Sequence, residues 1–387
     1  MRRVAVVGVG QTKFRTRRDD KTHPELTYEA MNKALEHAGL DIKDIQAIAY
    51  GTMDPFDGIY LPERWDVTSG GIGKPFMKIS TGGTTGMTTG LAAYEHVASG
   101  LFDIAMAVCT QRVGECVDAQ PVLNTAVCPI YERYSGAGAI SVAAIQATVH
   151  MHKYGTTEED LAWVSVKDHK NALKNPNAHI KLDIGVEEVL NSSVVSSPLK
   201  LLECCPRSDG AVAVIFASEE VAKKIRDNPA WVIAETTISD DYYTGDRPDL
   251  SDWDTLAIAG RRLYRFAGVD DPKKDIDVAE LYSPFTIQEV LELEALGFAK
   301  KGEGKNLARE GVTFPDGDMP TNPSGGVLCA NPIGATGLVR LAEASLQIMG
   351  EASNQVRDVD VSLAHAWGGT LQFHTLMLLS AKKKLKG

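Results

Sequence analysis

A histidine and a tyrosine are the side chains of this chain best suited to acid–base chemistry. His365 ends a predicted strand and is followed by paired glycines at 368 and 369, a setting that suits proton transfer near neutral pH. Tyr282 lies at a predicted strand-to-helix junction, where its phenol can donate a proton to an oxyanion or take one from a hydroxyl. A lone histidine or tyrosine is nevertheless more often a structural residue of the core.

A glycine-dense, nearly uncharged segment at residues 322–337 contains two further candidates. So many small residues together indicate that backbone passes close to a ligand or to other backbone. Its Asn331 can donate a hydrogen bond but cannot shuttle a proton. Cys329 lies two residues earlier, and its apolar, glycine-flanked setting favours an inert packed cysteine over a reactive thiol.

The loop at residues 81–87 precedes a predicted helix of small residues over 84–98. Backbone N–H groups at Gly83 and Thr84, together with the positive end of the helix dipole, can hold an anion or a thioester carbonyl. Close packing of this helix in the core explains the small residues equally well.

Three other motifs carry less weight. The segment 8–10 lacks the third glycine of a dinucleotide-binding loop, because position 13 is Lys13. His150 and His152 lie two residues apart on a predicted helix and face different ways, so they are not expected to share a metal. No Cys-x-x-Cys pair occurs, and we expect no metal site.

Composition indicates a globular enzyme. The chain has 387 residues, 44% hydrophobic and 24% charged, enough to bury a large core. A formal net charge of −11 argues against nucleic-acid binding. No stretch approaches about 18 uninterrupted apolar residues, so no membrane span is expected. The scattered cysteines favour reduced thiols and a cytoplasmic location.

Strands and helices alternate along the chain, which is typical of an α/β fold with helices covering both faces of a sheet. Strands are predicted at 4–8, 45–50, 104–109, 211–217, 276–281 and 359–365, and helices at 26–38, 84–98, 286–296 and 338–349. The segment 115–205 mixes amphipathic helices with irregular polar stretches and indicates an excursion between two core strands. The second half of the chain follows the order of the first.

The order of these segments resembles the thiolase superfamily over essentially the whole chain, and most of all its archaeal and sterol-carrier-type branch. Segment 322–337 is similar to that family's Asn-x-x-Gly-Gly and Gly-His-Pro-x-Gly-x-(Ser/Thr)-Gly loop. Further similar stretches lie at 150–155, 201–211 and 293–298. The resemblance implies two βαβαβαββ halves stacked as five layers (αβαβα). The first half is then 1–228, with a loop domain inserted at 115–205, and the second is 229–387.

The resemblance also implies where the chemistry departs from the family. The family's nucleophilic cysteine falls on Gly83, and the histidine of its Gly-His-Pro loop falls on Asn331. The histidine that archaeal members place before an Asx-Ala-Phe segment falls on Tyr282. Only the last catalytic position, His365, keeps a titratable group. An acyl-cysteine is therefore not available at the usual place.

Three activities remain under this resemblance. In the favoured one, coenzyme A itself attacks a 3-oxoacyl-CoA, with His365 as base. Asn331 and backbone N–H groups of the glycine loops, including Gly368 and Gly369, then hold oxyanions. The second is a retro-aldolase acting on a 3-hydroxyacyl-CoA, like steroid side-chain aldolases whose tyrosine matches Tyr282. The third is a non-catalytic acyl-CoA-binding scaffold. The first is favoured because 331–337 stays close to the thiolase loop.

The resemblance further implies the ligands and partners. Acyl-CoA and coenzyme A are expected as substrates, with no permanently bound cofactor, and an aromatic acyl group is one candidate. A homodimer of this chain is expected, together with a small partner subunit that carries a zinc ribbon and an OB fold.

Overall fold

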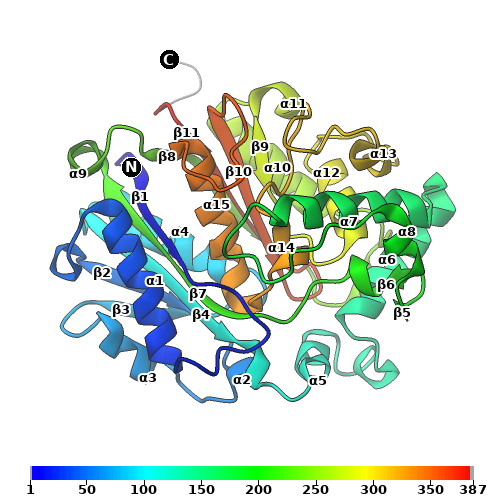
Figure 1. Cartoon of the computed structure of the whole chain (residues 1–387), viewed down its shortest axis with the longest axis horizontal. Helices are drawn as coiled ribbons and strands as arrows, with labels where there is room; N and C mark the ends of the chain where they lie inside the picture. The colour runs from blue at the N-terminus through cyan, green and yellow to red at the C-terminus, as the bar shows by residue number, and fades with distance from the viewer. Residues whose placement is uncertain (1, 384–387) are drawn as a thin grey trace.

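The computed structural model describes residues 2–383, and its main feature is a nine-stranded mixed sheet (Figure 1). The strands lie in the order β3-β2-β4-β7-β1-β8-β11-β10-β9. Their bounds are β1 Val4–Gln11, β2 Ala47–Gly51, β3 Phe76–Ile79, β4 Ile104–Arg112, β7 Asp209–Ser218, β8 Ala230–Ser239, β9 Val278–Glu280, β10 Val361–Gly368 and β11 Phe373–Ser380.

The two halves of this sheet repeat one pairing pattern. In the first half, β1–β7 and β7–β4 are antiparallel, whereas β4–β2 and β2–β3 are parallel. In the second half, β8–β11 and β11–β10 are antiparallel, and β10–β9 is parallel. Among residues 2–383 the second half has no full counterpart of β3, but an isolated parallel bridge from Ala279 to Thr321 lies at the equivalent position beside β9. A short antiparallel contact between β1 and β8 joins the halves, and the predicted repeat is confirmed.

Helices complete the expected layers. α1 (His23–Ala38) packs on β1 and β7, and α10 (Asp254–Ala267) packs on β8 and β11. α4 (Thr85–Ala98) and α15 (Thr336–Met349) contact each other and strands of both halves, so they form the central layer (Figure 1). Successive β1 side chains alternate between the core under α1 and the core around α4. The α/β fold with five layers is confirmed.

The long excursion also lies where it was predicted, between β4 and β7. It comprises α5 (Ala119–Leu123), α6 (Ala139–Tyr154), α7 (Glu158–Ala172), α8 (Val186–Asn191) and the hairpin of β5 (Val194–Ser196) and β6 (Leu199–Lys200). We propose that the first half ends near residue 228, because that position lies between α9 (Glu219–Ile225) and β8.

Several elements differ from the sequence prediction. α1 begins earlier than expected because Thr22 and Glu25 form a capping box, with the Thr22 N–H donating to the Glu25 carboxylate at 2.7 Å. Strands β3, β8 and β11 are not among the strands that the sequence predicts. β8 includes the polar run Glu235–Thr237, which breaks the apolar signal of a buried strand, yet its ladder with β11 fixes it as sheet.

His23 is held between two buried carboxylates at the start of α1. Its Nδ1 lies 2.7 Å from Oδ2 of Asp66, and its Nε2 lies 3.4 Å from Oδ2 of Asp57. Burial alone would lower the pKa of His23, but the two carboxylates outweigh it and raise the pKa to about 9. A histidine in the unfolded chain titrates near 6.5, so the charged form stabilises the fold fully below that pH.

We predict that this stabilisation is lost as the pH rises through 9. The unfolding free energy of the wild type should fall by about 3 kcal/mol relative to that of His23→Gln between about pH 6.5 and 9.5. Urea unfolding of both proteins across this range measures the difference. If the gap between the two proteins stays constant, His23 is not charged in the fold.

Candidate active site

One cavity of about 210 Å³ brings together five of the residues singled out from the sequence. They are Gly83, Tyr282, Asn331, Gly368 and Gly369. They come from the start of α4, the end of β9, the loop before α15 and the end of β10. The cavity lies where elements of both halves and the loop domain meet, so no single segment of the chain contains it.

Gly83 has no room for a side chain. A Cβ atom there would stand 2.6 Å from the backbone oxygen of Trp367 and 3.0 Å from the Tyr282 hydroxyl. A Cβ on Gly368 would stand 2.8 Å from the Gly83 nitrogen. The two glycine loops are therefore in direct backbone contact, which requires glycine on both sides.

Tyr282 closes the space above Gly83. Its hydroxyl is directed to the backbone oxygen of Ile333 at 3.4 Å, and its own backbone oxygen accepts from the Trp367 indole at 2.7 Å. Burial raises the pKa of Tyr282, and the neighbouring Cys205 raises it further. The phenol is therefore protonated at neutral pH and is available as a hydrogen-bond donor.

Asn331 presents an amide N–H group beside a thiol that sequence analysis did not select. Its Nδ2 donates to the Sγ of Cys205 at 3.1 Å, and its Oδ1 accepts from the Thr336 hydroxyl at 2.8 Å. Burial raises the pKa of Cys205 to about 11, although the hydrogen bond from Asn331 lowers it. Such a thiol stays protonated and is a poor nucleophile. Cys205 lies in the stretch 201–211, which resembles the thiolase superfamily but carries no pattern that would mark this thiol as part of a site.

His365 is not among the residues that line the cavity. Its Nε2 lies 3.2 Å from Nδ1 of His374, and its Nδ1 lies 3.6 Å from a carboxylate oxygen of Glu292. Trp367, two residues on along the same face of β10, lines the cavity instead. Burial lowers the pKa of His365 well below its usual value. The ring is neutral. The sequence predicted that His365 would share the cavity with Gly83, Tyr282 and Asn331, but the lining does not include it.

Thr84 and Cys329 also lie outside the cavity lining. The Thr84 hydroxyl donates to the backbone oxygen of Ala366 at 3.3 Å. Cys329 packs against Ala172 and Ala178, and burial raises the pKa of its thiol well above the usual value. Both residues pack the surroundings of the site, and a buried thiol with a raised pKa is a poor nucleophile.

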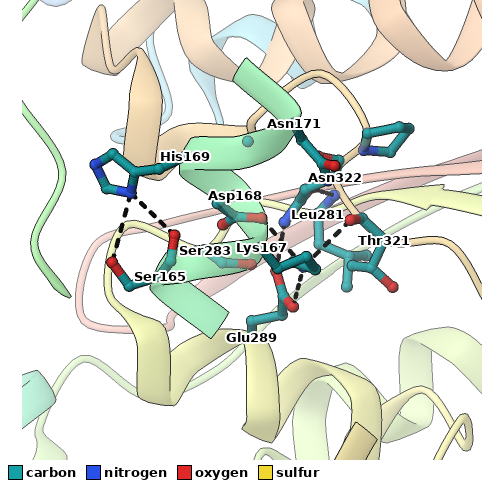
Figure 2. Close-up of polar contacts among 12 residues, drawn as sticks. Ser165, Lys167, Asp168, His169, Asn171, Leu281, Ser283, Glu289, Thr321 and Asn322 are labelled. Carbon is teal, nitrogen blue, oxygen red and sulfur yellow. Dashed lines mark hydrogen bonds and ion pairs between the residues drawn. The ribbon is translucent and has the colours of Figure 1, made fainter. Parts of the chain in front are cut away.

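A buried network of charged and amide groups holds the backbone of Leu281, the residue before Tyr282 (Figure 2). Lys167 of α7 forms a fully buried ion pair with Glu289 of α12 (Thr286–Ala295). Glu289 accepts from Nδ2 of Asn322 at 2.8 Å, and Oδ1 of Asn322 accepts from the backbone N–H of Leu281 at 2.8 Å. Asn322 has a φ of 51°, a left-handed conformation that asparagine tolerates. The residue before Tyr282 is thus fixed by the loop domain and by the 322–337 segment.

The walls of the cavity are mostly apolar. They include Met53, Phe56, Leu123 and Phe285. Of the lining residues, only Arg207 carries a charge. Within residues 2–383 no group of three or more His, Cys, Asp or Glu side chains is placed to hold a metal ion. In the same range no helix combines the length and apolar character that a membrane crossing requires.

Comparison with known proteins agrees with this architecture. Residues 4–220 match the model of the thiolase N-terminal domain, and residues 236–381 match the thiolase C-terminal domain-like model. The chain belongs to the thiolase family. An acetyl-CoA acetyltransferase of Methanothermobacter thermautotrophicus is 36% identical over 96% of this chain and 97% of its own length.

Two further thiolase-family relatives are informative. The benzoylsuccinyl-CoA thiolase subunit BbsB of Thauera aromatica is 32% identical over 95% of both chains. A solved structure described as an Ltp2-ChsH2(DUF35) aldolase superposes with a TM-score of 0.85 at 27% identity over 99% of both chains. The family therefore includes relatives named as acyltransferases and as an aldolase, so membership alone does not select the reaction.

The contact above Gly83 predicts a cost for any side chain there. Gly83→Ala and Gly83→Cys should each lower the unfolding free energy by about 1–3 kcal/mol, because the clash is with backbone and a buried tyrosine. Gly260→Ala in α10 is the matched control, since its Cβ would meet the flexible end of Leu296 at 3.2 Å and the Tyr264 ring at an ordinary contact distance of 3.7 Å. That variant should change stability by less than about 1 kcal/mol. Equal unfolding midpoints for Gly83→Ala and the wild type would show that the loops have room to separate.

Proposed function

We propose that this protein breaks or forms a carbon–carbon bond next to the thioester of an acyl-CoA without an acyl-cysteine intermediate. The observation that carries the proposal is the filled space above Gly83, where the family resemblance places the nucleophilic cysteine. Cys205, the thiol that does line the cavity, has a raised pKa and is hydrogen-bonded to Asn331. Chemistry that needs no protein nucleophile fits this arrangement best.

Both remaining reactions generate the enolate of a CoA thioester, and the same groups are suited to stabilise it. Nδ2 of Asn331 is a donor at the cavity wall, and the backbone N–H groups at the start of α4 add a positive dipole end. Preorganised donors in an apolar, partly dehydrated cavity are worth more than in water, because little reorganisation accompanies the reaction. We assign these groups to the thioester oxygen.

Retro-aldol cleavage of a 3-hydroxyacyl-CoA is the reaction that we favour. The 3-hydroxyl gives its proton to the Tyr282 oxygen while the phenol gives its own proton to C2. The C2–C3 bond breaks, its electron pair forms the C2–H bond by way of the enolate, and C3 becomes a carbonyl. Tyr282 ends as it began, so its raised pKa is no obstacle.

Two observations favour retro-aldol cleavage over thiolysis, the reaction that the sequence alone favoured. His365, which thiolysis used as its base, is not part of the cavity lining, whereas Tyr282 is. Direct thiolysis also requires the site to hold two coenzyme A moieties at once, the one attached to the substrate and the one whose thiol attacks C3. A retro-aldol reaction requires only the first. The solved aldolase structure with a TM-score of 0.85 adds to this support.

Thiolysis of a 3-oxoacyl-CoA by free coenzyme A is the second candidate. The glycine loop at 331–337 and the 32% identity to a benzoylsuccinyl-CoA thiolase subunit favour it. That relative also makes an aromatic acyl group one substrate to test. We further propose that the chain works with a small partner subunit of the zinc-ribbon and OB-fold kind, since the solved neighbour is an aldolase of two named components. A homodimer of this chain is proposed from the family resemblance alone.

Product analysis separates the reactions. The purified protein, alone and with any co-purifying subunit, is incubated with 3-hydroxyacyl-CoA and, separately, with 3-oxoacyl-CoA plus coenzyme A. We expect an aldehyde or ketone and a shortened acyl-CoA from the first substrate, with no need for free coenzyme A. Two thioesters from the second substrate would establish thiolysis instead. Acyl-CoA binding without turnover in both cases would leave only the scaffold.

The proposed proton transfer predicts that removal of the Tyr282 hydroxyl lowers kcat strongly. Tyr282→Phe should lower kcat by about 10²- to 10⁴-fold with little change in KM, because the ring remains and only the proton carrier is lost. Cys205→Ser should keep most of the activity, and mass spectrometry of the wild type during turnover should find no acyl group on Cys205. An acylated Cys205 would overturn the proposed mechanism.

His365 is tested in the same assay. His365→Asn should lower kcat much less than Tyr282→Phe, because the imidazole is neutral and packed beside His374 rather than in the cavity. Circular dichroism and the unfolding midpoint serve as the folding control. A loss of activity as large as that of Tyr282→Phe, in a folded variant, would restore His365 as the base.

A further inference from the structure

The active-site cavity is adjoined by a second, smaller cavity of about 50 Å³, which we call the inner cavity. The two share part of their lining, namely Leu123, Ala126, Ala139, Trp367 and Gly369. The two cavities therefore lie side by side, with Trp367 and Gly369 in their common wall.

The loop domain and the β10–β11 turn build the inner cavity. Ala139, Val142 and Gln146 lie at successive spacings of three and four residues on one face of α6. The opposite wall includes Leu371, which is buried and has a φ of 68°. A leucine in this left-handed conformation is uncommon and costs about 1–3 kcal/mol, which the packing around the turn must offset.

Two buried glutamines belong to the polar part of this lining, together with Thr370, whose hydroxyl already donates to the backbone oxygen of Tyr242 at 3.1 Å. Gln146 is 1% exposed and Gln288 is 2% exposed. Nε2 of Gln288 donates to Oε1 of Gln146 at 3.3 Å. Oε1 of Gln288 has no hydrogen-bond partner among residues 2–383. Because a buried acceptor without a partner costs about 1–3 kcal/mol, this atom marks a position where a donor from a ligand belongs.

The backbone at Gln288 is held by buried neighbours. Gln288 is followed in α12 by Glu289, whose fully buried ion pair with Lys167 fixes that turn of the helix. Gln146 lies on α6, which packs against α12. A shift of the backbone is therefore a poor route to a hydrogen bond for Oε1 of Gln288. A donor group that enters the inner cavity can supply that bond without such a shift.

We propose that the inner cavity binds the distal end of the substrate's acyl group, and that this end carries an uncharged hydrogen-bond donor such as a hydroxyl. The surrounding residues, Val127, Val142 and Leu371, favour an apolar chain up to that point. No charged residue lines the inner cavity, so a carboxylate or ammonium group would lose its hydration without a partner. The volume suits only the last few atoms of a chain, since one water takes roughly 30 Å³.

This proposal rests on the proposed function only in taking an acyl-CoA as the ligand of the active-site cavity. The test therefore uses saturated acyl-CoA thioesters that have no oxygen at C3 and cannot react. A graded series of chain lengths is prepared, each with and without a terminal hydroxyl, and affinities are measured by isothermal titration calorimetry. Binding is then scored whether or not cleavage occurs in the product assay.

At the chain length that reaches Gln288, the hydroxylated thioester should bind about ten-fold more tightly than its alkyl counterpart. Gln288→Leu should abolish this preference. Gln120→Leu is the matched control, because Gln120 lines the active-site cavity but not the inner one, and it should keep the preference. Val142→Phe, which fills the inner cavity, should weaken the long thioesters and leave acetyl-CoA binding unchanged.

Equal affinity of the hydroxylated and alkyl thioesters at every length would overturn the proposal and would mean that a water molecule satisfies Gln288. A preference that survives in Gln288→Leu would overturn it as well. If Gln288→Leu does not fold, the Val142→Phe series decides, and undiminished binding of long thioesters to that variant contradicts the proposal.

Discussion

The site depends on one steric constraint, the direct backbone contact between the loop that starts α4 and the glycine pair that ends β10. The backbone oxygen of Trp367 stands 2.6 Å from where a Gly83 side chain would begin. This contact closes the position of the family's nucleophile and brings a hydroxyl, an amide and backbone N–H groups around one small volume. The chemistry proposed for the protein follows from this arrangement, because only reactions that use the ligand's own atoms as nucleophile or leaving group remain.

Buried charge keeps that arrangement in place. Tyr282 follows a short strand, and a three-residue strand alone would position a phenol poorly. The Lys167–Glu289 ion pair and the side chain of Asn322 hold the preceding backbone, so α7 of the loop domain, α12 and the glycine-rich segment act together (Figure 2). Removing one member of a fully buried pair leaves an uncompensated charge, which is why such networks define a single geometry. The same helix α12 carries Gln288 toward the inner cavity, so both subsites share one support.

The sequence predicted the fold and much of the site, but not which side chains face the cavity. Glycine spacing and helix starts identified Gly83, Asn331 and Gly368, because close backbone approach requires particular residue types that are visible in a sequence. His365 was selected by the same reasoning, yet Trp367 takes the cavity wall and leaves the histidine packed against His374. Cys205 gave no such signal, because nothing local distinguishes a cysteine beside a cavity from a cysteine in a core.

By itself the sequence determined the alternation of strands and helices, the two repeated halves and the absence of a thiol at position 83, since these depend on residue type and local periodicity. Only the tertiary structure decided that Tyr282 fills the space above Gly83, that Asn331 contacts Cys205, and that a second cavity lined by a pair of glutamines adjoins the first. The contacts of Asn331 with Cys205 and of Gln288 with Gln146 join residues 126 and 142 positions apart, and they depend on packing between layers that no local pattern encodes.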